Sequence, residues 1–70
     1  MKPGDIVRVT YGVNLIYISP YRNETLGKTR KDEILLVLEP HQVYVKILHP
    51  SLGVGWVNRT FLEVISEAYA

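Results

Sequence analysis

Short runs of alternating apolar and polar residues, most of them ended by proline or glycine, recur along the whole chain. In the first run, DIVRVTY at 5–11, Val7, Val9 and Tyr11 would share one face of a strand. β-Branched residues dominate these runs, which suits a pleated and half-buried surface. The pattern predicts an all-β fold rather than a layered arrangement of helices and strands.

Four further strands are predicted in the second half of the chain. EILLVLE at 33–39 is a nearly continuous apolar run, and the turn PHQ at 40–42 joins it to VYVKILH at 43–49. Two such runs across a short polar turn are typical of an antiparallel hairpin. The turn PSLG at 50–53 then leads to VGWVN and FLEVI, which brings the expected number of strands to five.

A long excursion at 12–32 separates the first two predicted strands. Its first arm, Leu15 to Ser19, has the composition of a strand or of one arm of an irregular hairpin. Its centre, up to Gly27, is polar and rich in turn residues. Loops of this length are uncommon in compact domains and are often functional.

The chain is too short for a second core and carries no cysteine. Its 70 residues therefore predict a single domain spanning 1–70, and they exclude disulfides and thiolate metal sites. A domain of this size buries only about 60% of the surface that its unfolded chain exposes, so apolar packing has to stabilise it. Closing the sheet into a small barrel would remove the exposed strand edges.

One strand near the C-terminus stops and restarts. In GVGWVNRTFLEVI at 53–65, the polar residues 58–60 interrupt the strand, which resumes at Phe61. This segment and KPGDIVRV at 2–9 resemble the two ends of SH3-like (Src-homology-3-like) barrels of the bacterial and bacteriophage type. The resemblance implies a five-stranded barrel in which residues 58–60 form one turn of 3-10 helix before the last strand.

The same resemblance implies the identity of the three connecting segments: the long RT loop at 12–32, the n-Src loop at 40–42 and the distal turn at 50–53. Eukaryotic members of the family bind proline-rich peptides on an aromatic shelf. That shelf uses a tryptophan opening the third strand, a proline after the fourth and a tyrosine in the 3-10 turn. Here those positions hold Gln42-Val43, Asn58 and Phe61, so the resemblance does not extend to ordinary polyproline recognition.

Aromatic residues flank both the long loop and the interrupted strand. If the loop folds toward the turn at 58–60, their rings converge on one face, and such rings supply much of the binding energy of protein interfaces. The candidate protein-binding residues are Tyr17, Tyr21, Trp56, Asn58 and Phe61. The alternative is that these rings, together with Tyr11, only pack the loop against the barrel.

Basic residues also cluster in the long loop. The candidate nucleic-acid-binding residues are Arg22, Lys28, Arg30 and Lys31, which are interleaved with tyrosines. That pattern suits phosphate contacts with bases stacked on the rings. Nearby acidic residues and a net charge of +1 dilute the cluster, so the alternative is an ordinary solvated loop.

The chain has more apolar residues than one small barrel can enclose. The run 34–38 offers apolar side chains to both faces of its strand, and Ile6, Ile16, Ile18 and Leu48 fall on faces that alternation assigns to solvent. Either the long loop covers them or they form an exposed patch. Such a patch normally marks an interface with a partner or a second copy of the chain.

No catalytic pattern is apparent in the sequence. It lacks a GxSxG motif and a glycine-rich phosphate loop, and both His41 and His49, beside proline-containing turns, are predicted to be exposed. We therefore expect no enzymatic activity, cofactor, metal or small-molecule substrate. The N-terminus has no apolar run of signal-peptide length, and no segment reaches the roughly 20 apolar residues of a membrane span. These features predict a cytoplasmic protein, or a virion protein if phage-encoded, without membrane contact.

The sequence thus favours a non-enzymatic protein-interaction module. It would be a bacteriophage virion or assembly component, or a small effector that docks on a protein partner, and self-assembly remains an option. The first alternative is nucleic-acid or ribosome binding through the basic loop. The second is recognition of cell-wall peptidoglycan, as in bacterial relatives that are fused to hydrolases.

Overall fold

The computed structural model describes residues 1–19, 22 and 24–68, so the candidate residue Tyr21 lies outside the described part of the chain. The described chain is all-β, with a short 3-10 helix, η1 (Arg59–Phe61), before the last strand. The strands are β1 (Ile6–Val9), β2 (Val13–Tyr17), β3 (Thr25–Arg30), β4 (Ile34–Pro40), β5 (Tyr44–His49), β6 (Gly53–Asn58) and β7 (Leu62–Ser66). Within these described residues, no helix is long and apolar enough to cross a membrane.

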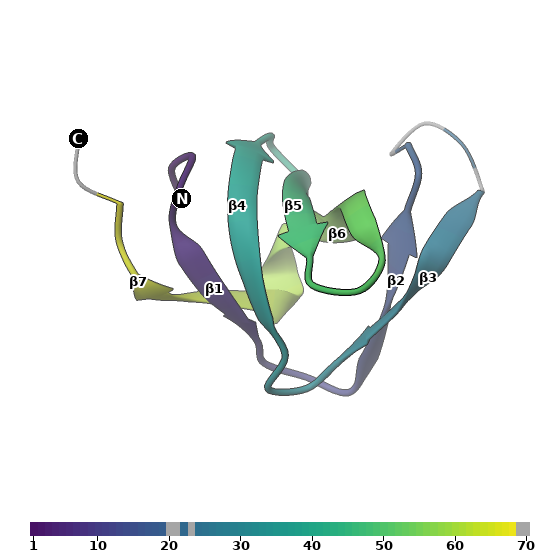
Figure 1. Cartoon of the computed structure of the whole chain (residues 1–70), viewed down its shortest axis with the longest axis horizontal. Coiled ribbons are helices and arrows are strands. Elements are labelled where there is room, and N and C mark those ends of the chain that lie inside the picture. Colours follow the sequence, from purple (N-terminus) through teal and green to yellow (C-terminus); the bar gives the residue numbers. More distant parts are fainter. Residues whose placement is uncertain (20–21, 23, 69–70) are drawn as a thin grey trace.

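All seven strands belong to one antiparallel sheet with the order β3-β2-β6-β5-β4-β1-β7. The sheet is strongly curved, with β2 and β3 rising on one side and β1 and β7 lying on the other (Figure 1). The strands at its two edges are β3 and β7. The sheet is therefore open, and the expected five-stranded barrel is not confirmed.

The excursion at 12–32 contains a hairpin, and for this reason the expected count of five strands is wrong. Strand β2 pairs with β3, from Val13 opposite Arg30 to Tyr17 opposite Thr25. The first arm carries apolar and β-branched residues that favour a strand. The second arm, TLGKTR, contains a glycine and two basic residues, which weaken the strand signal in the sequence.

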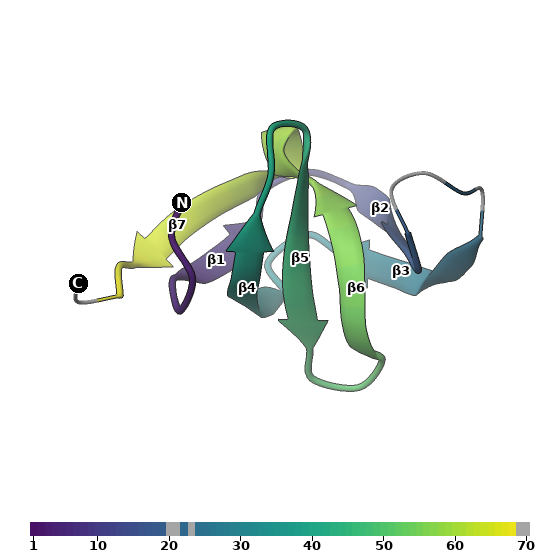
Figure 2. The same ribbon diagram turned by 90° about the horizontal axis from the view of Figure 1, so that it is seen from above.

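The concave face of the sheet holds the hydrophobic core. Its buried residues come from every strand except β3: Val7, Val9, Ile16, Leu35, Val37, Val45, Ile47, Val57 and Leu62. Seen from above, β4, β5 and β6 run side by side between β1 and β7 on one side and β2 and β3 on the other (Figure 2). Through Ile16, β2 shares this core, and the hairpin is thereby held against β6.

A glycine lets β2 approach β6 closely. Gly55 is buried in β6, and a Cβ added there would overlap the side chain of Ile16 and lie 3.3 Å from the carbonyl oxygen of Tyr17. The close approach places Tyr17 directly opposite Trp56 in the β2–β6 pair. Gly55 is therefore the position that allows the hairpin to join the sheet.

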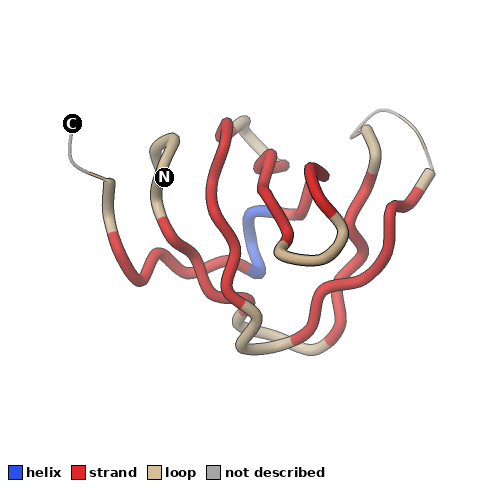
Figure 3. Tube along the Cα trace, in the orientation of Figure 1, coloured by secondary structure: helices blue, strands red, loops and turns tan. Residues whose placement is uncertain are grey.

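The interruption before the last strand is a 3-10 turn, as the resemblance implied, but it lies one residue later than 58–60. It spans Arg59–Phe61 and is the blue segment of Figure 3. Asn58 has extended backbone and caps the turn, because its Oδ1 accepts a hydrogen bond from the Thr60 N–H at 2.9 Å. The Arg59 N–H also donates to the carbonyl of Val43 at 2.9 Å, which ties the turn to the segment before β5.

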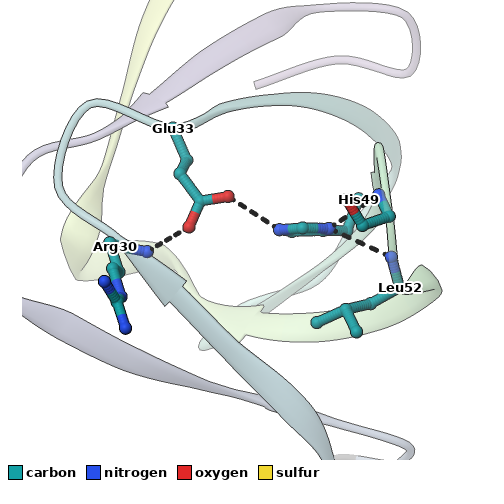
Figure 4. A network of polar contacts seen from close by, with 5 residues as sticks. Arg30, Glu33, His49 and Leu52 are labelled. Atoms are coloured by element: carbon teal, nitrogen blue, oxygen red, sulfur yellow. Dashed lines mark hydrogen bonds and ion pairs between the residues drawn. The ribbon is translucent and has the colours of Figure 1, made fainter.

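His49 is buried, with 6% of its surface exposed, so the expectation that it is solvent-exposed is wrong. Its Nδ1 accepts hydrogen bonds from the backbone N–H groups of Ser51 and Leu52, at 3.0 and 3.1 Å. Nε2 therefore carries the ring proton and donates a hydrogen bond to Glu33 Oε2 at 2.8 Å. The other oxygen of Glu33 accepts from the Arg30 N–H at 2.6 Å (Figure 4). The ring thus connects the β5–β6 turn to the β3–β4 turn.

Asp5 is a buried acidic residue, and its exposed fraction is 1%. Its Oδ1 accepts from the Ala68 N–H at 2.7 Å and its Oδ2 from the Lys2 N–H at 2.9 Å. The Ala68 hydrogen bond is the main reason that the pKa of Asp5 lies below its ordinary value, against the opposing effect of burial. Asp5 thereby fastens the segment after β7 to the start of β1.

Candidate functional site

A groove of about 220 Å³ opens between the hairpin and the end of β6, and we call it the aromatic groove. Its lining residues are Val13, Asn14, Leu15 and Tyr17 of β2, Tyr44 of β5, Asn58 of β6 and Phe61 of η1. Two cross-strand pairs bring these walls together, Tyr17 opposite Trp56 and Tyr44 opposite Asn58. Three of the five candidate protein-binding residues therefore meet here.

The aromatic rings of the groove are held by ring contacts. Tyr17 and Tyr44 meet edge to face, with centroids 5.9 Å apart and planes at 80°. On the other side, Phe61 stacks on Tyr11, with centroids 6.2 Å apart and planes at 22°. Aromatic pairs in these geometries attract one another beyond their simple burial, so the rings are pre-positioned.

Trp56 lies beside the aromatic groove and does not line it. It is half-buried on the outer face of β6, between its cross-strand neighbours Tyr17 and Lys46. The ring of His41 contacts the indole edge to face, with centroids 5.0 Å apart. Trp56 therefore extends the aromatic surface from the groove along β6.

Two asparagine side chains add polar groups to the aromatic groove. The Nδ2 of Asn14 donates to the carbonyl of Tyr11 at 2.6 Å, and this leaves its Oδ1 as an acceptor. The Oδ1 of Asn58 is occupied by the capping bond, which leaves its Nδ2 as a donor. Besides the hydroxyl groups of Tyr17 and Tyr44, the two asparagines thus provide one acceptor and one donor.

The four basic candidates are spread along the hairpin. Lys28 and Arg30 are exposed on β3, directly opposite Leu15 and Val13, which line the aromatic groove. Lys31 lies in the turn after β3, and Arg22 precedes β3 at the other end of the hairpin. The structure therefore brings two of the four to the groove's outer flank.

The acidic side chains are mostly engaged elsewhere. Arg8 binds both Asp32 and Glu63, at 2.6 and 3.1 Å. Glu39 pairs with His41 at 3.0 Å, and Glu33 with His49. Within the described residues, none of the four basic candidates lies within ion-pair distance of a carboxylate, so the net charge of +1 hides a local positive excess.

Part of the apolar surplus forms a row across the outer face of the sheet. Ile6 lies opposite Leu36, Leu36 opposite Leu48, and Leu48 opposite Val54. Leu48 and Val54 remain 40% and 49% exposed. Ile16, which alternation had assigned to solvent, is instead fully buried, since it points from β2 into the core.

Four groove residues were not predicted from the sequence: Val13, Asn14, Leu15 and Tyr44. Alternation within β5 already places Tyr44 on the face opposite Val45. The sequence does not reveal the pairing register of β5 and β6, which places Tyr44 opposite Asn58. The three β2 residues become visible only once β2 is known to lie against β6.

In the described part of the chain, no group of three or more histidine, cysteine, aspartate or glutamate side chains is arranged to hold a metal ion. Comparison with protein-family models, with curated proteins and with solved structures finds no match to this chain.

Proposed function

We propose that this chain is a non-enzymatic protein-interaction module and that the aromatic groove is its docking site. The observation that carries the proposal is the convergence of Tyr17, Tyr44 and Phe61 on a groove of about 220 Å³. Rings in an accessible groove supply large contact areas to a partner at a small entropic cost, as in protein-binding hot spots. Their mutual contacts pre-organise the groove, which lowers the cost of binding.

We further propose that the fold is an SH3-like barrel of the bacterial and bacteriophage type, with the β2–β3 hairpin in the place of the RT loop. The strand order β7-β1-β4-β5-β6 supports this, because short turns join β4 to β5 and β5 to β6 and η1 joins β6 to β7. That order agrees with the succession of loops that the resemblance implies. The corresponding setting is a virion or assembly component, or a small cytoplasmic effector of a protein partner.

A second candidate function is binding of single-stranded nucleic acid along β3. The observation in its favour is that Lys28 and Arg30 lie side by side on the outer face of an edge strand, next to the tyrosines of the groove. Cations beside stacking rings are the usual elements of such sites. A steep loss of affinity with salt would identify this function.

Site-specific photo-crosslinking tests the proposed docking site. Leu15, which lines the groove, and Leu48, which lies outside it on β5, are each 40% exposed and form a matched pair. Each is replaced by p-benzoyl-phenylalanine, and the tagged chain is irradiated in nuclease-treated extract of its source. We expect one specific protein adduct from position 15 that excess unmodified chain abolishes. Adducts from position 48 alone would move the docking site to the apolar row.

A further inference from the structure

The charges around the aromatic groove are unbalanced. On the hairpin wall, Lys28 and Arg30 stand opposite two groove residues, without a carboxylate at ion-pair distance among the described residues. Arg59, exposed in η1, directly follows the groove residue Asn58. Of the acidic residues around the hairpin, Glu33 accepts from the Arg30 N–H and pairs with His49, Glu39 pairs with His41, and Glu24 precedes β3. The groove is therefore flanked by positive charge.

The polar groups of the groove match an extended polypeptide backbone. An extended segment offers carbonyl acceptors and N–H donors at regular intervals. The free Nδ2 of Asn58 can donate to such a carbonyl, and the free Oδ1 of Asn14 can accept from such an N–H. Both groups project from the groove's own walls, between apolar and aromatic side chains.

We propose that the aromatic groove binds an extended acidic peptide segment. One large apolar or aromatic side chain of the segment enters between Tyr17, Tyr44 and Phe61, and its aspartate or glutamate neighbours lie along Lys28 and Arg30. The inference rests on the proposed function and adds the chemistry of the partner to it. Exposed ion pairs of this kind orient a ligand and speed its encounter more than they add affinity.

A peptide accounts for the arrangement better than a nucleic-acid strand. A strand bound through its phosphates requires a path of cations along its whole length. Here the cations flank the groove at Lys28, Arg30 and Arg59, whereas Tyr44 and Phe61 provide apolar surface. The free Oδ1 of Asn14 matches a backbone N–H, a donor that a phosphodiester backbone does not have, whereas the Nδ2 of Asn58 suits the acceptors of either ligand.

The proposal is tested with short synthetic peptides and the isotope-labelled full chain. Three peptides each contain one tyrosine and one leucine. The remaining residues are aspartate and glutamate in the acidic peptide, serine and glutamine in the neutral peptide, and lysine and arginine in the basic peptide. Amide chemical shifts locate the binding site and give the affinity. At moderate salt we expect the acidic peptide to bind about fivefold more tightly than the neutral one, as two exposed ion pairs provide. The shifted amides should be those of the groove residues.

Two double variants, each lacking two positive charges, show whether affinity depends on the charges beside the groove or on the net charge of the chain. The double variant K28Q/R30Q should bind the acidic peptide about fivefold more weakly and leave the neutral peptide unaffected. The control K2Q/K31Q removes the same charge from positions that are not paired with groove residues, and it should change neither affinity.

The other outcomes overturn the inference in distinguishable ways. If acidic and neutral peptides bind equally well in the groove, the preference for an acidic partner is wrong, but the proposed docking function is not contradicted. Binding of all peptides outside the groove overturns both. Stronger binding of an oligothymidylate on the same amides, lost with added salt, replaces both with the nucleic-acid function. If no probe binds, the inference fails, and the crosslinking experiment at Leu15 and Leu48 decides the proposed function alone.

Discussion

Tyr17 of β2 lies directly opposite Trp56 of β6, and this pair joins the hairpin to the rest of the sheet. Tyr17 also forms part of the groove wall and meets Tyr44 edge to face. A single residue thus takes part in the pairing of two sheet segments and in the shape of the candidate docking site. Changes that loosen the β2–β6 contact should therefore affect stability and binding together.

The first prediction concerns the close approach at Gly55. In Gly55→Ala, the added methyl group meets the Ile16 side chain and the backbone of Tyr17, neither of which can move without disturbing the β2–β6 pair. We expect a loss of about 1–3 kcal/mol in the free energy of unfolding, as for overpacking of a core. Urea unfolding followed by the fluorescence of Trp56, the single tryptophan, measures it.

Gly27→Ala is the matched control for this prediction. A Cβ at Gly27 meets only the side chain of Leu52, which is 37% exposed and free to rotate away. The loss should accordingly be smaller than for Gly55→Ala. Equal losses in the two variants would show that the β2–β6 contact has no special role.

The contrast between Gly55 and the regular strands explains what the sequence can predict of this fold. Strands β1, β4, β5, β6 and β7 follow from local alternation and turn residues, and the sequence predicts all of them. The open seven-stranded sheet does not follow, because it depends on a contact between β2 and β6 that only the absence of a side chain at Gly55 allows. Local patterns carry no information on such a contact.

The same limit applies to the site and to the buried polar groups. Tyr17, Asn58 and Phe61 were predicted because the resemblance places the loop and the 3-10 turn together, whereas Tyr44 depends on cross-strand register. His49 was predicted to be exposed because Pro50 follows it in a turn. Its burial depends on Glu33, which lies sixteen residues away in the sequence and supplies the hydrogen-bond acceptor that a buried ring requires.

The second prediction concerns pH. Burial alone would raise the pKa of Glu33, but hydrogen bonds from the Arg30 N–H and the His49 ring hold it below its ordinary value of 4.5. A carboxylate with a lowered pKa in the folded state stabilises the fold above its ordinary pKa, and this contribution is lost as the pH falls through the lowered value. Glu33→Gln should reduce the free energy of unfolding at neutral pH. It should also make the loss of stability below about pH 4.5 less steep.

Urea midpoints measured from neutral to acidic pH test this prediction. Glu67→Gln serves as a control, since Glu67 is exposed and makes no ion pair with the described residues. Its pH profile should match that of the unchanged chain. The role given to Glu33 is wrong if Glu33→Gln retains the full acid-dependent decline.

The third prediction separates the two roles of Asn58. Asn58→Ala removes the acceptor for the Thr60 N–H, and we expect the unfolding free energy to fall by about 1 kcal/mol, as for other lost caps. Asn58→Asp keeps a capping oxygen, so its stability should stay close to that of the unchanged chain. The same variant replaces the free amide donor with a negative charge and should weaken binding of the acidic peptide. Unchanged peptide affinity in a stable Asn58→Asp variant would place the ligand elsewhere.

The fourth prediction concerns the tyrosines at the groove. Tyr44→Ala removes one wall of the groove and the edge-to-face contact with Tyr17, so it should weaken binding of the acidic peptide by about 2 kcal/mol, or about thirtyfold. Tyr11→Ala is the control, because Tyr11 stacks on Phe61 from outside the groove lining and is 71% exposed. We expect it to reduce affinity much less. Amide chemical shifts establish that each variant is folded before its affinity is measured, and a folded Tyr44→Ala variant with undiminished affinity would exclude the aromatic groove as the binding site.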